Sequence, residues 1–176
     1  MTLADLGNIG EIVGAIGVIA SLIYVGLEVR RNTQALRAQA HERVVSGYMD
    51  SINVISQHAG TFAKGFQSSY DEFTTFTEEE KVIFFGMIFG FFKHFEQIHA
   101  QYRRGLIGEE EWSAWSEHIG MQFHQEGPQW WWKLRRTSFA PPFREYLDHC
   151  PRPDMELLTD ILKDRGNRAV SSRGHG

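Results

Sequence analysis

An apolar run near the start of the chain is its strongest pattern, with the sequence IGEIVGAIGVIASLIYVGLEVRR at residues 9–31. From Ile12 to Leu27 there are 16 residues without a charge. A helix over them is about 24 Å long, or about 28 Å when counted from Ile9, against a bilayer core of about 30 Å. Apolar or small side chains occupy its whole circumference, whereas a helix buried in a soluble bundle usually keeps a polar stripe. The pattern therefore predicts a membrane-spanning signal anchor over residues 9–27.

Two alternatives to a signal anchor differ in how well they fit. A cleaved export signal begins with basic residues and ends at a small-residue cleavage site, but residues 1–11 contain no Lys or Arg and no such site follows. A helix buried in a soluble bundle stays open, because the run is close to the shortest length that spans a bilayer. For an inserted helix, the positive-inside rule predicts the orientation. The arginines follow the run, so residues 1–8 are expected outside and the remainder inside.

Small residues form a stripe on this predicted helix. They are spaced by four, three and four positions, which places them within a sector of about 60°: Gly10, Gly14, Gly17 and Ser21. Small residues allow the backbones of two membrane helices to approach closely. The stripe predicts a helix-packing face toward another copy or another membrane protein. The simpler alternative is that small residues are common in membrane helices.

Helical periodicity continues through the rest of the chain. The long first helix is expected to become amphipathic and to end near Ala59–Gly60, followed by a short helical segment over 61–73. Thr77 and Glu80 form a capping-box pattern before a central helix that Gly105 ends. Further helices are expected up to Gly127–Pro128, from Pro128 onward, between the prolines of 140–153, and over 154–166. Because no segment alternates with period two, we expect an all-α fold, with a helical bundle at 28–164 and a disordered tail at 165–176.

Charge and cysteine content narrow the functional classes. The formal net charge is −4 and basic residues are interleaved with acidic ones, so the chain lacks the basic patch expected of a nucleic-acid binder. The single cysteine, Cys150, excludes an internal disulfide and a metal site built on several cysteines.

Three consecutive tryptophans precede a basic cluster. The segment contains Trp130, Trp131, Trp132, Lys133, Arg135 and Arg136. Tryptophan beside basic side chains is typical of a membrane interface. Alternatively, two indoles pack in the core and one lies on the surface, since successive helical residues point about 100° apart.

Glu96 and His99 are the pair that most resembles catalytic chemistry. A Glu-x-x-His spacing places both side chains on one helix face, as in di-iron bundles, but those bundles need two such pairs and two further glutamates. No second Glu-x-x-His occurs in the chain. The expectation is therefore a structural polar pair without metal or cofactor, with a metal-dependent or small-molecule-binding enzyme as the alternative.

Two blocks of the sequence resemble a widespread group of uncharacterised bacterial proteins. They are residues 9–37, which contain RRNTQALR, and HFEQIHAQYRRGLIGEEEWSAW, with a later Trp pair and FREYLD. The resemblance covers residues 9 to about 148. It implies a helical, membrane-anchored architecture in the bacterial inner membrane and brings no activity and no site residues.

Together these patterns predict a non-catalytic, membrane-anchored interaction or accessory subunit. Its expected partners are membrane lipid and, through the glycine stripe, either itself or a larger membrane complex. A peripheral membrane sensor that uses the tryptophan and basic residues is the remaining alternative.

Overall fold

The computed structural model describes the backbone of residues 3–153, and the side chains of Gly14 and residues 16–153. Within these residues the fold is all-α and contains no strand. The predicted terminal helix at 154–166 and the tail at 165–176 lie outside the described residues. Contacts divide the chain between Ala40 and His41 into an N-terminal and a C-terminal unit.

A single helix begins the chain and belongs to both units. Helix α1 runs over Leu3–Gln57, as the periodicity predicted, and ends just before the expected boundary at Ala59–Gly60. The segment over 61–73, for which a short helix was predicted, consists of two helices, α2 (Ala59–Gln67) and α3 (Tyr70–Thr74). Ser69 and Glu72 form a capping box that begins α3. The sequence contains the Ser-x-x-Glu pattern that is typical of a capping box.

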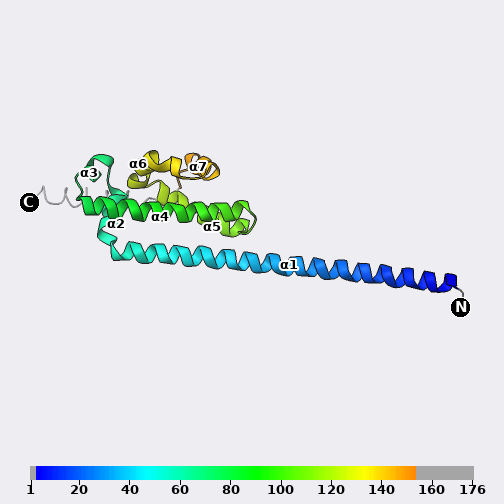
Figure 1. Ribbon diagram of the computed structural model, residues 1–176. Coiled ribbons are helices and arrows are strands. Elements are labelled where there is room, and N and C mark those ends of the chain that lie inside the picture. The colour runs from blue at the N-terminus through cyan, green and yellow to red at the C-terminus, as the bar shows by residue number, and fades with distance from the viewer. Residues whose placement is uncertain (1–2, 154–176) are drawn as a thin grey trace, which may run out of the picture. The chain divides into compact units, whose positions relative to one another are not determined.

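Helix α4 (Glu78–Arg103) is the central element of the C-terminal unit. Thr77 accepts a hydrogen bond from the Glu80 amide and Glu80 bonds back to the Thr77 amide, so the predicted capping box is confirmed. Gly105 follows the helix with a φ of 69°, a left-handed conformation that favours glycine. Figure 1 shows α4 between the C-terminal part of α1 and helices α6 and α7.

The remaining elements are α5 (Glu109–Phe123), α6 (Glu126–Arg135), a 3-10 turn η1 (Arg136–Ser138) and α7 (Pro141–Asp148). The connection between α5 and α6 was predicted at Gly127–Pro128, but it lies earlier in the sequence, because α6 already includes both residues. The reason is packing. A Cβ at Gly127 would lie 2.1 Å from the Gly65 carbonyl oxygen, so the glycine is needed where α6 meets α2.

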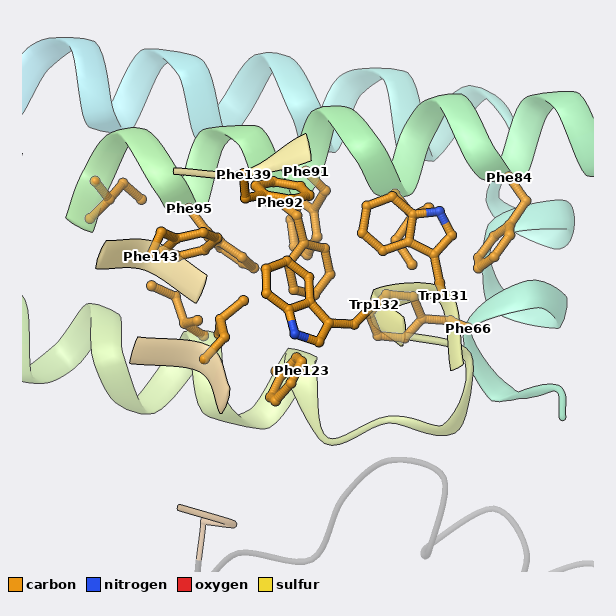
Figure 2. Close-up of a cluster of buried hydrophobic side chains, with 14 of the residues drawn as sticks. Phe66, Phe84, Phe91, Phe92, Phe95, Phe123, Trp131, Trp132, Phe139 and Phe143 are labelled. Atoms are coloured by element: carbon orange, nitrogen blue, oxygen red, sulfur yellow. The ribbon is translucent and has the colours of Figure 1, made fainter. Parts of the chain in front are cut away.

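The core of the C-terminal unit is built largely from aromatic rings. The apolar face of α4 buries Phe84, Ile88, Phe92 and Phe95 completely. Phe92 lies 5.6 Å from the ring of Trp131 and 6.3 Å from that of Phe123, which joins α4 to α6 and α5 (Figure 2). Each buried ring contributes roughly 1.5–3 kcal/mol by leaving water, so this aromatic layer fixes the helices around α4.

Candidate functional site

The apolar side chains of α1 in the N-terminal unit are exposed. Nine of them have between 51% and 66% of their surface accessible: Ile16, Val18, Ile19, Leu22, Ile23, Tyr24, Val25, Leu27 and Val29. They occupy nine of the 14 positions from Ile16 to Val29 and surround most of the helix, while the remaining sector carries the small residues Gly17 and Ser21. A large exposed apolar surface in a folded chain marks a site of contact with a membrane or another protein. This segment is therefore the first candidate for a functional surface.

The predicted glycine stripe lies within this segment. A Cβ at Gly14 or Gly17 would meet no other atom within 4 Å, so no described part of the chain covers those positions. The Ser21 hydroxyl donates to the Gly17 carbonyl at 2.8 Å, which satisfies it along its own helix. The surroundings of Gly10 lie outside the described side chains.

Among the described residues, no helix meets the length and apolarity of a membrane span. The predicted span begins at Ile9, and the side chains of 9–13 and of Ala15 lie outside the described part of the chain. Four arginines follow the apolar segment, and all of them are exposed: Arg30, Arg31, Arg37 and Arg43.

The tryptophans of α6 point into the C-terminal unit. Trp131 and Trp132 are buried, with exposures of 0% and 4%. The half-buried Trp130 donates to the Ser68 carbonyl at 2.9 Å and stacks near Phe73. These positions fit the interpretation that the indoles are core residues. Membrane contact through Trp131 or Trp132 finds no support, because α6 is covered by aromatic rings on two adjacent sides.

The basic residues after the tryptophans lie on the surface. Lys133, Arg135 and Arg136 are exposed. Arg136 pairs with Asp148, which also accepts a hydrogen bond from Trp132 Nε1 at 3.0 Å. The Arg135 guanidinium lies 5.5 Å from the Phe85 ring centroid. Two of the three cations thus have partners within the fold.

Glu96 connects α4 to the start of α7. One carboxylate oxygen accepts from the Ala140 amide at 2.5 Å, and the other pairs with Lys93 at 2.7 Å. Ala140 is the N-cap of α7, so Glu96 satisfies an amide that the helix itself leaves unpaired. Lys93 also donates to the Ser138 carbonyl at 2.8 Å. Both residues therefore hold the 138–140 connection against α4.

His99 does not share these contacts. Its ring stacks on Tyr146 with centroids 5.0 Å apart, and it is 7% exposed. Burial lowers the pKa of His99, and the charge of Arg103 lowers it further. No three His, Cys, Asp or Glu side chains gather to hold a metal ion within the described residues. The contacts of Glu96 and His99 described above are structural, and both residues also line one cavity of about 270 Å³ beside Arg103 and Arg104.

Sequence reasoning missed a polar–aromatic cluster formed by Tyr48, His94, Trp115 and His118. The Tyr48 hydroxyl lies 3.0 Å from His118 Nε2, within hydrogen-bonding distance. The Trp115 ring lies 5.3 Å from that of Tyr48 and 6.4 Å from that of His94. The cluster joins α1, α4 and α5, and no local motif could reveal it because Tyr48 and His118 are 70 residues apart.

His94 is the most constrained member of this cluster. Its Nε2 atom is buried and has no hydrogen-bond partner. A Cβ at Gly47 would lie 2.8 Å from the ring, which explains the glycine at this point of α1. Burial lowers the pKa of His94 and of His118. Burial thus disfavours the charged form of both imidazoles in the folded unit.

An apolar groove lies between the C-terminal end of α1 and α4. Its cavity volume is about 460 Å³. The floor consists of Ile55, Ile83, Met87 and Phe91, and two glycines of α4, Gly86 and Gly90, lie along one edge. Sequence reasoning did not identify this groove, because its two sides come from segments about 30 residues apart.

No family model, no curated protein and no solved structure matches this chain. The functional conclusion therefore rests on the surfaces described above.

Proposed function

We propose that this protein is a non-catalytic, membrane-anchored interaction or accessory subunit. In this proposal residues 9–27 insert into a lipid bilayer, and the C-terminal unit is a rigid helical platform on the cytoplasmic side. The observation that carries the proposal is the exposure of the nine apolar side chains from Ile16 to Val29, which surround α1 except for the face of small residues. A single soluble partner covers one face of a helix, whereas a bilayer covers all of them.

The energetics of these side chains support insertion. Burying one large apolar side chain stabilises by roughly 1.5–3 kcal/mol relative to leaving it in water. An inserted helix recovers this for its whole circumference, and its backbone groups are already paired internally. The arginines from Arg30 onward then stay on the cytoplasmic side, where positive residues accumulate.

Association through the glycine face is the second part of the proposal. Lipid chains are as apolar as leucine, so membrane helices associate through close packing. Gly14 and Gly17 offer a surface without side chains, and nothing described in the chain occupies it. The partner is a second copy or another membrane protein.

The test compares two double variants in native membranes. Gly14→Ile with Gly17→Ile adds bulk to the stripe, whereas Ile19→Leu with Ile23→Leu changes the opposite face at constant volume. We expect both proteins to resist extraction by alkaline carbonate. Chemical crosslinking should give adducts for the wild type and the leucine control and should lose them in the glycine variant. Equal yields of adducts in all three proteins would contradict the proposed packing face. Release of the wild type by carbonate would contradict the proposed membrane anchor.

A further inference from the structure

The cavity of about 270 Å³ lies where the last turns of α4 meet the start of α7. Its α4 side is formed by Glu96, His99, Ala100, Arg103 and Arg104. These positions are spaced i, i+3, i+4, i+7 and i+8, which is one face of a helix. The α7 side is formed by Ala140, Pro142 and Phe143. All of these residues belong to the C-terminal unit, so an inference about the cavity does not rest on the proposed membrane anchor.

The ring of His99 is surrounded by aromatic side chains and is left without a hydrogen bond. It stacks on Tyr146, and the rings of Trp112 and Phe143 lie 5.5 and 5.7 Å away between centroids. Only 7% of the residue is exposed. Within the described part of the chain no group forms a hydrogen bond with its ring nitrogens, although buried polar groups usually have such a partner. The imidazole therefore keeps one donor and one acceptor unused at the wall of the cavity.

Two arginines bring positive charge to the same cavity. Arg103 and Arg104 are exposed, and neither forms an ion pair with the residues that the structure describes. A basic residue in the last turn of a helix often does no more than offset the negative end of the helix dipole. That explanation accounts for a charge at this end of α4. It does not account for two adjacent guanidinium groups that border a cavity together with an unpartnered imidazole.

The carboxylate of Glu96 does not cancel this positive charge. One of its oxygens accepts from the Ala140 amide, and the other pairs with Lys93 at 2.7 Å. Lys93 thus balances Glu96, and the charges of Arg103 and Arg104 remain for a ligand. Because the Glu96 carboxylate still lies in the wall, it repels a second negative charge on that ligand. The cavity therefore favours a single negative charge over two.

We propose that this cavity binds a small organic carboxylate. A guanidinium group matches a carboxylate with two parallel hydrogen bonds, and the N–H of His99 donates to a carboxylate oxygen. Ala100, Pro142 and Phe143 offer apolar contacts to a short hydrocarbon body. The volume lies slightly below the range of about 300–1,000 Å³ that is common for ligand pockets. The ligand is therefore a monocarboxylate of about the size of benzoate, and inorganic phosphate, which has no apolar body, is a weaker ligand.

The direct test titrates benzoate into the full chain, purified in mild detergent at pH 7.5. The histidine ring signals are followed by NMR, and those of His99 are assigned by their loss in His99→Phe. We expect benzoate to shift the His99 signals to saturation and benzyl alcohol, which has a similar shape but no charge, to leave them in place. Inorganic phosphate should bind about tenfold more weakly than benzoate. His99 signals that ignore benzoate, or that respond equally to benzyl alcohol or phosphate, overturn the proposal.

A second test removes the positive charge at exposed positions, where the fold does not depend on it. Arg103→Gln with Arg104→Gln should raise the benzoate dissociation constant about tenfold or more in calorimetric titration, with little change in melting temperature. Arg37→Gln with Arg43→Gln is the matched control, because these exposed arginines lie outside the cavity. It should leave the constant unchanged. Equal constants for the cavity variant and the wild type contradict the proposal.

The role of the imidazole is tested by His99→Phe. Phenylalanine keeps a ring that can stack on Tyr146 but has no nitrogen, so the melting temperature at pH 7.5 should not fall. The dissociation constant for benzoate should rise by about tenfold, because a hydrogen bond to a charged group is lost. Benzoate binding that is as tight in His99→Phe as in the wild type overturns the proposed contact between His99 and the ligand.

Discussion

At the scale of single residues, two buried histidines, His94 and His99, and the half-buried His118 distinguish this core from an ordinary apolar one. His94, His99 and His118 are enclosed by aromatic rings, and burial lowers the pKa of each. The folded unit therefore disfavours their protonation, whereas the unfolded chain takes up protons as the pH falls through about 6.5. The unfolded state binds more protons below this pH, so stability is fully present above about 6.5 and decreases as the pH falls toward the folded-state pKa values.

His94→Asn should test this pH dependence. The asparagine side chain is polar but does not titrate. We expect a lower melting temperature at pH 7.5, because the ring leaves a gap, and a smaller decrease between pH 7 and pH 5. Proton uptake on unfolding should fall by up to about one per chain. The exposed His58→Asn is the control, and an identical pH profile in wild type and His94→Asn would rule out a role for His94.

Glu96 allows a structural role to be separated from a metal-binding one. Glu96→Ala removes the acceptor for the exposed Ala140 amide at the start of α7 and should destabilise the protein by about 0.5–1.5 kcal/mol. Glu117→Ala, at an exposed position of α5, should change the stability little. Elemental analysis should find no stoichiometric metal in wild type or variant. One or two metal ions per chain that disappear with Glu96→Ala and His99→Ala would instead favour the enzyme alternative.

At the scale of elements, local signals predicted most helix boundaries. The Thr77–Glu80 capping box, Gly105 after α4 and the prolines around α7 all act within a few residues, so they are legible in a sequence. Gly127 is different. It looked like a helix stop, but its role is the close approach of α6 to α2, a contact between residues far apart in the chain.

The burial of the α6 tryptophans likewise depends on contacts with residues far apart in the sequence. Periodicity alone assigns one apolar face to a helix, so three consecutive indoles predicted at least one exposed ring. Trp131 packs near Phe89 and Phe139 on one side, while Trp132 packs near Phe123 and Phe143 on another. A helix enclosed by several neighbours buries adjacent residues, and that enclosure depends on the tertiary fold.

The capping box gives a direct prediction for α4. Thr77→Ala removes the acceptor for the Glu80 amide and should lower the unfolding free energy by about 1 kcal/mol. Thr77→Ser keeps a hydroxyl at the same position and should be close to the wild type. Thermal unfolding followed by circular dichroism makes this comparison. Equal losses for alanine and serine would show that the methyl group of Thr77, and not its hydroxyl, stabilises the helix.

At the scale of the whole molecule, the two units differ in whether their apolar side chains are buried within the unit. The C-terminal unit contains its own aromatic core, with α4 at the centre and polar groups paired at the ends of its helices. The N-terminal unit is a helical segment whose apolar side chains have no described cover. Sequence periodicity found this segment, because a continuous apolar run needs no tertiary information. The groove between α1 and α4 required the structure, because its edges come from two helices.

The proposed anchoring predicts the orientation of the chain. Arg30, Arg31, Arg37 and Arg43 follow the apolar run, whereas residues 1–11 contain Asp5 and Glu11 and no Lys or Arg. A reporter fused to the C-terminus and active only in the cytoplasm should therefore be active, and one active only outside should be silent.

Charge reversal at the flanks provides the matched test of this orientation. Asp5→Lys with Glu11→Lys, combined with Arg30→Gln and Arg31→Gln, moves the positive bias to the other side of the apolar run. A measurable fraction of chains should then invert, and the two reporters should exchange activity in that fraction. Glu42→Gln with Asp50→Gln lies beyond the run and changes only acidic residues, which contribute little to topology, so it should leave both reporters unchanged. Recovery of the intact wild type in the soluble fraction without detergent would contradict insertion itself. The nine exposed apolar side chains would then be buried against soluble protein and not against lipid.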